Sequence, residues 1–123
     1  MALTTELVGN GLFISAARAI QGTLQSGITA DPGSSQAAAF QLTRAINVVA
    51  TVATIGDSLR LPKAEVGDEI WVRNNAANSL DIFPQVGGTI NNGSVDAAYA
   101  VAGTKTAVLK ATTTLDWIAA VTA

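Results

Sequence analysis

After Ser35, the sequence is built from short runs rich in β-branched residues, each ended within a few positions by Gly, Pro, Asn or Asp. Apolar and polar side chains alternate along these runs, which is the period of a β-strand. In residues 69–74, Ile70 and Val72 share one face while Trp71 and Arg73 share the other. Each face therefore carries large side chains that another layer or a partner could bury. We therefore expect a single all-β domain, a sandwich or small barrel of about seven to nine short, mostly antiparallel strands.

Turn residues divide these runs and predict where the chain reverses. The tripeptides Ile55-Gly56-Asp57 and Val66-Gly67-Asp68 each place an Asp after a glycine at a junction between strands, where its side chain can satisfy free backbone N–H groups. Residues 74–78 have the spacing of a hairpin loop, so residues 80–83 are expected to pair antiparallel with residues 69–74. Residues 87–94 are rich in Gly and Asn, and Asn-Gly suits the positive φ angles of a type I′ turn.

Residues 1–35 lack this texture, and we expect them to form an irregular N-terminal arm or first layer before a β domain of residues 36–123. The glycines of this region and residues 31–35 predict turns or loops. Residues 16–21 predict a short helix that Gly22 ends. Residues 23–29 predict a short strand added to this layer.

Histidine and cysteine, which carry much of the acid–base, nucleophilic and metal chemistry of proteins near neutral pH, are absent from all 123 residues. The carboxylates that remain are scattered. Asp68 and Glu69 are adjacent, but adjacent side chains on a strand face opposite sides. Asn91, Asn92 and Asp96 offer oxygen atoms to Ca²⁺, yet a calcium loop brings several carboxylates, and a polar hairpin tip is the better interpretation. We predict that the chain is not an enzyme and has no catalytic, cofactor-binding or metal-binding residues.

The distribution of charged and apolar residues also limits which kinds of partner are expected. Seven basic and nine acidic residues give a net charge of −2 and form no basic stripe, so nucleic acid is not an expected partner. No run approaches the roughly 18 to 20 apolar residues that span a bilayer, and the N-terminus does not fit a secretory signal. We therefore expect no membrane partner.

The chain is apolar for a soluble protein of its size, with 49% hydrophobic and 13% charged residues and a mean hydropathy of +0.37. One interpretation is that copies of the chain, or another protein, cover part of its exterior. The alternative is an alanine-rich composition with no meaning for interfaces. The first interpretation favours a role in packing or binding.

Few side chains are large enough to fill the interior, so most of the aromatic residues are expected in the core. Phe83 is the expected exception, because it lies opposite Leu80 and Ile82 in the alternation and beside Pro84. An exposed Phe83 favours a contact between subunits over ligand binding. The candidate interface residues are Leu12, Phe13, Ile14, Phe83 and Pro84.

The region from Gln36 to Trp117, about two-thirds of the chain, resembles small structural proteins of tailed bacteriophages in the order of its short hydrophobic and turn motifs. The residues that carry the resemblance are Ala39-Phe40-Gln41-Leu42-Thr43, Ile46-Asn47-Val48-Val49, Leu59-Arg60-Leu61-Pro62, Gly67-Asp68-Glu69-Ile70-Trp71-Val72-Arg73-Asn74, Asn78-Ser79-Leu80-Asp81-Ile82-Phe83-Pro84, Gly87-Gly88-Thr89-Ile90-Asn91 and Leu115-Asp116-Trp117.

This resemblance implies a virion component, a capsid decoration or cement protein that is made in the host cytoplasm and sits on the capsid exterior. Its implied partners are itself, as a homotrimer, and the major capsid protein. It implies no catalytic residue. The alternatives are a tail, baseplate or head-fibre component and, from a different class, a carbohydrate-binding module that attaches to host glycans through Trp71, Phe83 or Tyr99.

Overall fold

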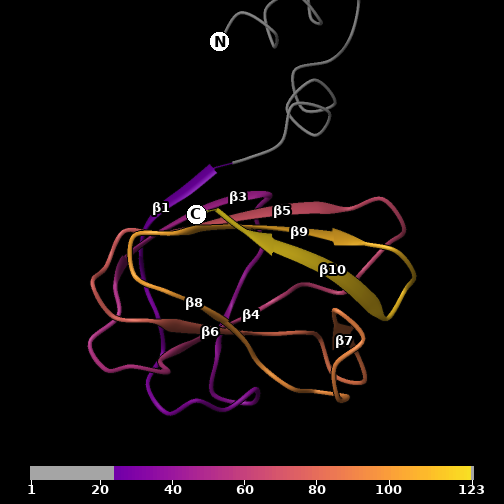
Figure 1. Cartoon of the computed structure of the whole chain (residues 1–123), viewed down its shortest axis with the longest axis horizontal. Coiled ribbons are helices and arrows are strands. Elements are labelled where there is room, and N and C mark those ends of the chain that lie inside the picture. Colours follow the sequence, from indigo (N-terminus) through magenta and orange to yellow (C-terminus); the bar gives the residue numbers. More distant parts are fainter. Residues whose placement is uncertain (1–23, 123) are drawn as a thin grey trace, which may run out of the picture.

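The computed structural model describes residues 24–122, which form ten β-strands and no helix (Figure 1). The strands are β1 (Leu24–Thr29), β2 (Phe40–Gln41), β3 (Ile46–Thr51), β4 (Ser58–Arg60), β5 (Glu69–Asn74), β6 (Leu80–Phe83), β7 (Thr89–Ile90), β8 (Tyr99–Val101), β9 (Thr106–Ala111) and β10 (Asp116–Val121). The predicted all-β class is confirmed for this part of the chain, and the strands are more numerous than expected.

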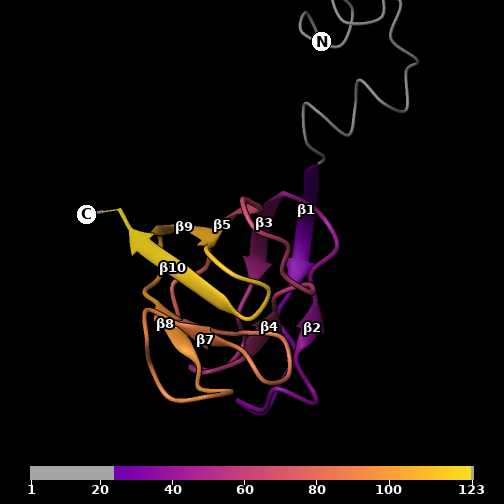
Figure 2. The same ribbon diagram turned by 90° about the vertical axis from the view of Figure 1, so that its right-hand side faces the viewer.

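The strands form two sheets, and the chain passes from one sheet to the other with each of its first six strands. The six-stranded sheet has the order β1-β3-β5-β9-β10-β7, and the four-stranded sheet has the order β2-β4-β6-β8. Figure 1 shows β1, β3, β5, β9 and β10 as one layer above β4, β6 and β8. Figure 2 shows β1, β3 and β5 following one another from one side of the molecule. Each circuit adds one strand to both sheets, which is a β-solenoid-like arrangement.

The prediction of mostly antiparallel strands in a sandwich or small barrel is wrong. Five of the eight strand pairs are parallel, among them β1–β3, β3–β5, β2–β4 and β4–β6. Parallel neighbours need a long crossover, and here the strand in the opposite sheet supplies it. Alternation along a strand reports which side chains share a face and carries no information about the direction of the neighbouring strand.

The predicted hairpin between residues 69–74 and 80–83 is also wrong, because β5 and β6 belong to different sheets. The buried Asn74 holds the corner between them. Its Nδ2 donates to the carbonyl oxygens of Asn78 (2.9 Å) and Val101 (3.2 Å), and its Oδ1 accepts the N–H of Ala76 (3.0 Å). This side chain satisfies backbone groups at the point where the chain leaves one sheet for the other.

The two turns with a Gly-Asp pair are confirmed. The backbone N–H of Thr54 donates to Asp57 Oδ2 at 3.0 Å, and the N–H of Glu65 donates to Asp68 Oδ2 at 3.0 Å. The glycine before each Asp has a positive φ, 93° in the first turn and 91° in the second, as the third position of a type II turn requires. Both turns direct the chain from one strand toward the next strand in the other sheet.

The core lies between the two sheets. Trp117 on β10 is only 1% exposed, and its neighbours in the core come from both sheets. The largest fully buried side chains are Trp117, Leu42, Leu59, Leu61, Leu80, Ile82, Leu109, Val49, Val72, Val101, Asn47 and Asn74. Phe40 and Tyr99 are partly buried against this core. The prediction that most aromatic side chains are core residues is confirmed for the part of the chain that the structure describes.

The first described strand belongs to the larger sheet. β1 pairs in parallel with β3, with Leu24 opposite Ile46, and it forms one edge of the six-stranded sheet. The predicted strand within residues 23–29 is thereby confirmed at 24–29. The predicted helix over residues 16–21 lies outside the described residues, and the division of the chain after residue 35 stays a prediction.

Candidate interaction surface

Several carboxylates of the described residues hold turns and loops together. Besides the two turns above, Asp96 Oδ1 accepts the N–H of Gly87 (2.7 Å) and Nε2 of Gln36 (3.0 Å). Asp81 Oδ2 accepts the hydroxyl of Ser34 at 2.6 Å. Within residues 24–122, no three His, Cys, Asp or Glu side chains are grouped so that they could hold a metal ion. These carboxylates act as turn and loop acceptors in this fold.

The asparagine-rich tip after β7 is also internally bonded. Asn91 Oδ1 accepts the N–H of Ala119 at 2.8 Å, and its Nδ2 donates to the carbonyl of the same residue at 3.1 Å. Asn91 and Asn92 have φ angles of 54° and 56°, and the N–H of Gly93 donates to the carbonyl of Ile90 at 3.0 Å. A type I′ turn therefore forms one residue earlier than the predicted Asn92-Gly93 pair, and the Asn91 oxygen is bound to the backbone of β10.

A row of apolar side chains crosses the outer face of the six-stranded sheet. In the strand register, Trp71 of β5 lies opposite Ile46 of β3 on one side and Val108 of β9 on the other. Leu24 of β1 and Ala120 of β10 continue the row at its two ends. These five side chains, Leu24, Ile46, Trp71, Val108 and Ala120, are the Trp71 row.

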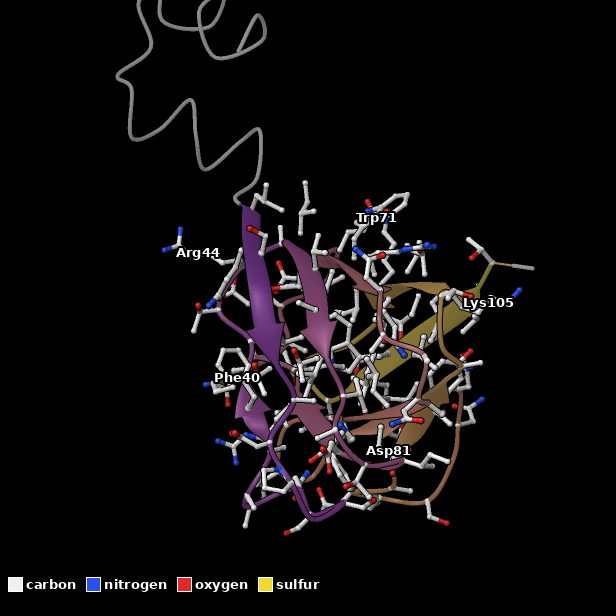
Figure 3. All side chains as sticks on the ribbon, turned by 90° about the vertical axis from the view of Figure 1, so that its left-hand side faces the viewer. Phe40, Arg44, Trp71, Asp81 and Lys105 are labelled. Carbon is white, nitrogen blue, oxygen red and sulfur yellow. The ribbon has the colours of Figure 1, made fainter. Side chains whose placement is uncertain are left out.

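Most of the Trp71 row is open to solvent in the isolated chain. Leu24 is 59% exposed, Ile46 42% and Trp71 44%, and Ile118 lies beside the row with 53% exposure. Figure 3 shows the Trp71 side chain projecting from its strand on the side away from β4 and β6. Such a contiguous set of large apolar side chains on a sheet face is typical of an interaction site.

Alternation along β5 explains why Trp71 lies outside the core. Ile70, Val72 and Asn74 are buried, whereas Glu69 and Trp71 are exposed. Trp71 is the only exposed aromatic side chain among residues 24–122. The sequence signal for this site is the presence of large side chains on both faces of residues 69–74. The sequence names Trp71 as a candidate for glycan stacking and not as one of the candidate interface residues.

Charged side chains flank the row on either side along β5. Glu69 precedes Trp71 by two residues and pairs in register with Lys110 of β9. Arg73 follows Trp71 by two residues, donates from Nε to Asn75 Oδ1 at 2.7 Å and from a terminal nitrogen to Thr106 Oγ1 at 3.3 Å. An apolar centre with a charged rim is the usual organisation of a protein–protein interface.

The predicted interface residues lie elsewhere. Leu12, Phe13 and Ile14 are outside the described residues. Phe83 is 7% exposed and Pro84 is buried, so the prediction of an exposed Phe83 is wrong.

The position of β6 in the fold explains this burial. β6 lies between β4 and β8, and Gln36 Nε2 donates to the carbonyl of Pro84 at 2.8 Å, which brings the segment before β2 against the end of β6. Neither Phe83 nor Pro84 offers a contact surface in the isolated chain.

A comparison of the sequence with models of protein families and with curated proteins found no match. In the part of the chain that the structure describes, no helix has the length and apolar character needed to cross a membrane.

Proposed function

We propose that this chain is a structural protein that works through protein–protein contacts and catalyses no reaction. The observation that carries the proposal is the exposed Trp71 row, with its charged rim, on the outer face of the six-stranded sheet. Trp is enriched among the residues that dominate binding energy, especially when apolar neighbours exclude water around it. Contact with another protein surface would remove this apolar area from water, which is favourable by about 25 cal/mol per Å².

The more specific proposal is a decoration protein on the exterior of a bacteriophage capsid. The resemblance of residues 36–117 to small structural proteins of tailed phages supports it, as does a surface suited to packing. The proposed partners are further copies of the chain, in a homotrimer, and the major capsid protein. Many weak contacts repeated over a symmetric shell add up without any single strong site.

Imaging of virus particles tests this proposal. The coding sequence is deleted from the phage genome that carries it, and the particles are compared with the parent particles by electron microscopy and by the temperature at which the heads release DNA. We expect density to be lost from the capsid exterior and the heads to open at a lower temperature. Particles that are identical in density and heat resistance would contradict the proposal.

The same images distinguish the alternative within the virion. Density lost from the tail, the baseplate or a head fibre, with the capsid exterior unchanged, would replace decoration by one of those roles. Light scattering on the purified chain tests the proposed homotrimer, and a stable monomer at micromolar concentration would rule it out.

The second candidate function is carbohydrate binding, and a half-exposed Trp71 is the observation that favours it. An aromatic ring on an open sheet face is a surface on which a sugar ring can stack. The register neighbours of Trp71, Ile46 and Val108, are aliphatic, however, so hydrogen bonds to sugar hydroxyls would have to come from Glu69 and Arg73, two residues away along β5. We therefore rank this function below protein contact.

A further inference from the structure

The outward side chains of β5 have a symmetric arrangement of charge. Glu69 and Arg73 stand two residues before and two residues after Trp71, on the same exposed face. Same-face neighbours on a strand are separated by about 6.6 Å. The backbone positions of an acidic and a basic residue therefore lie at equal distances before and after Trp71, near the middle of the six-stranded sheet.

We propose that the Trp71 row binds the same row of a second copy of this chain, about a two-fold axis that runs along the row and across the strands. This inference rests on the proposed function in one respect, that the sheet face is a protein contact, and it names the partner and the geometry of that contact. A two-fold contact is isologous, so a surface that takes part in it must be complementary to itself.

Rotation by 180° about this axis places each strand over the same strand of the second copy and reverses its direction. Trp71 then lies over Trp71, while the position two residues before it lies over the position two residues after it. Glu69 of each copy faces Arg73 of the other. Two opposite-charge pairs thus flank a central apolar contact, and the strands of the two sheets remain aligned as in face-to-face sheet packing.

The neighbouring strand fits the same operation. On β9, Thr106 and Lys110 stand two residues on either side of Val108, so the cation of Lys110 faces the hydroxyl of Thr106 and no like charge. The other face-to-face two-fold axis, parallel to the strands through Trp71, would place Glu69 over Glu69 and Arg73 over Arg73. Like charges directly opposed across an interface are unfavourable, so the charge pattern selects the axis along the row.

Arg73 is already positioned for such a contact. Two of its N–H donors are used by Asn75 and Thr106, which hold the side chain along the sheet surface. A guanidinium group has five N–H donors in all, so others remain for a carboxylate of the second copy. Holding the group before binding reduces the side-chain entropy that association must remove.

The size of the face sets the expected strength. Five strands about 4.8 Å apart and about six residues long, at 3.3 Å per residue, form a face of about 19 by 20 Å. This face covers about 400 Å² per copy, or about 800 Å² for the two copies together, which is below the range of stable specific interfaces and within that of weak, transient contacts. We therefore expect weak association, with a dissociation constant of about 100 µM.

The experiment measures the mass of the purified chain by sedimentation and light scattering over about 10 µM to 1 mM, which spans the expected dissociation constant. No capsid is present, so failure of this contact and failure of capsid decoration are separate results. We expect two copies, or an even multiple if a three-fold contact elsewhere also forms. Trp71→Ser is expected to halve the mass, and circular dichroism checks that the variant is folded.

Exchanging the charges of Glu69 and Arg73 tests the proposed axis directly. Glu69→Arg and Arg73→Glu, each alone, oppose like charges across the axis, and each is expected to weaken association at least about tenfold. The double variant, Glu69→Arg with Arg73→Glu, restores opposite charges in exchanged positions and is expected to restore the mass. Glu65→Arg and Lys63→Glu, exposed residues of the β4–β5 connection, are the matched controls and are expected to leave the mass unchanged.

Three results would overturn the inference. The first is a parent chain that remains a monomer at the highest concentration. The second is an oligomer whose mass Trp71→Ser does not change, which would place self-association on another surface. The third is a folded double variant that stays as weakly associated as either single variant, because restored complementarity is the particular consequence of the proposed axis.

Discussion

The indole Nε1 of Trp117 donates a hydrogen bond to Oε1 of Gln85 at 2.8 Å and so satisfies the polar atom of the largest fully buried side chain among the described residues. Gln85 Nε2 in turn donates to the carbonyls of Thr114 and Leu115, both at 3.2 Å. One amide therefore ties the loop after β6 to the start of β10, and the core Trp depends on a residue from a loop.

Gln85→Ala is expected to lower the free energy of unfolding by about 1–3 kcal/mol, because a buried indole N–H is left without its acceptor. Urea denaturation followed by circular dichroism measures the change. Ser94→Ala, on an exposed position of the neighbouring loop, serves as the control and is expected to change stability by less than about 0.5 kcal/mol. Equal stability of the two variants would show that water replaces Gln85 at no cost.

The corner residue Asn74 gives a second prediction. Asn74→Ala removes a donor and an acceptor that serve the backbone groups of Asn78, Val101 and Ala76, and we expect a loss of about 2–3 kcal/mol, since buried polar groups are left unpaired. Asn75→Ala, which removes an exposed contact with Arg73, is the matched control and is expected to cost under about 1 kcal/mol. A small effect at Asn74 would mean that the corner forms without its side chain.

Replacing Gly103 or Gly67 by alanine is expected to lower stability for different reasons: a steric clash at Gly103 and an unfavourable backbone angle at Gly67. A Cβ at Gly103 would collide with the backbone carbonyl of Ala77, whereas a Cβ at Gly67 meets no atom within 4 Å and is disfavoured only by the φ of 91°. We expect Gly67→Ala to cost about 1–2 kcal/mol and Gly103→Ala to cost more than about 3 kcal/mol, because backbone atoms cannot easily move aside. Thermal unfolding of both variants checks the order, and the reverse order would contradict the close approach at Gly103.

Iodide quenching of tryptophan emission distinguishes the two candidate functions at Trp71. Trp117 is 1% exposed and Trp71 is 44% exposed, so iodide reaches Trp71 almost alone. At fixed protein concentration, we expect a panel of cell-surface glycans to leave the quenching unchanged, because the row offers aliphatic neighbours and few polar partners. Protection of Trp71 from iodide by a saccharide would favour the carbohydrate-binding function instead.

Local features of this fold were readable from the sequence because their causes are local. The Gly-Asp turns at 56–57 and 67–68 depend on a residue that tolerates positive φ followed by a carboxylate within reach of a nearby N–H. The alternation in β5 assigned Ile70 and Val72 to one face and Trp71 to the other, and the structure has the same division.

The direction and partners of the strands were decided only by the tertiary structure. Residues 74–78 have hairpin spacing, but Asn74 finds its partners at Asn78 and Val101, the latter distant in sequence, and the chain crosses to the other sheet. Phe83 was expected outside, and Trp71 was expected to contact a glycan at most, because alternation distinguishes two faces and does not say which of them another layer will cover. In this protein both sheets bury one face against each other, and only packing between segments far apart in the chain determined that the Trp71 row would remain open.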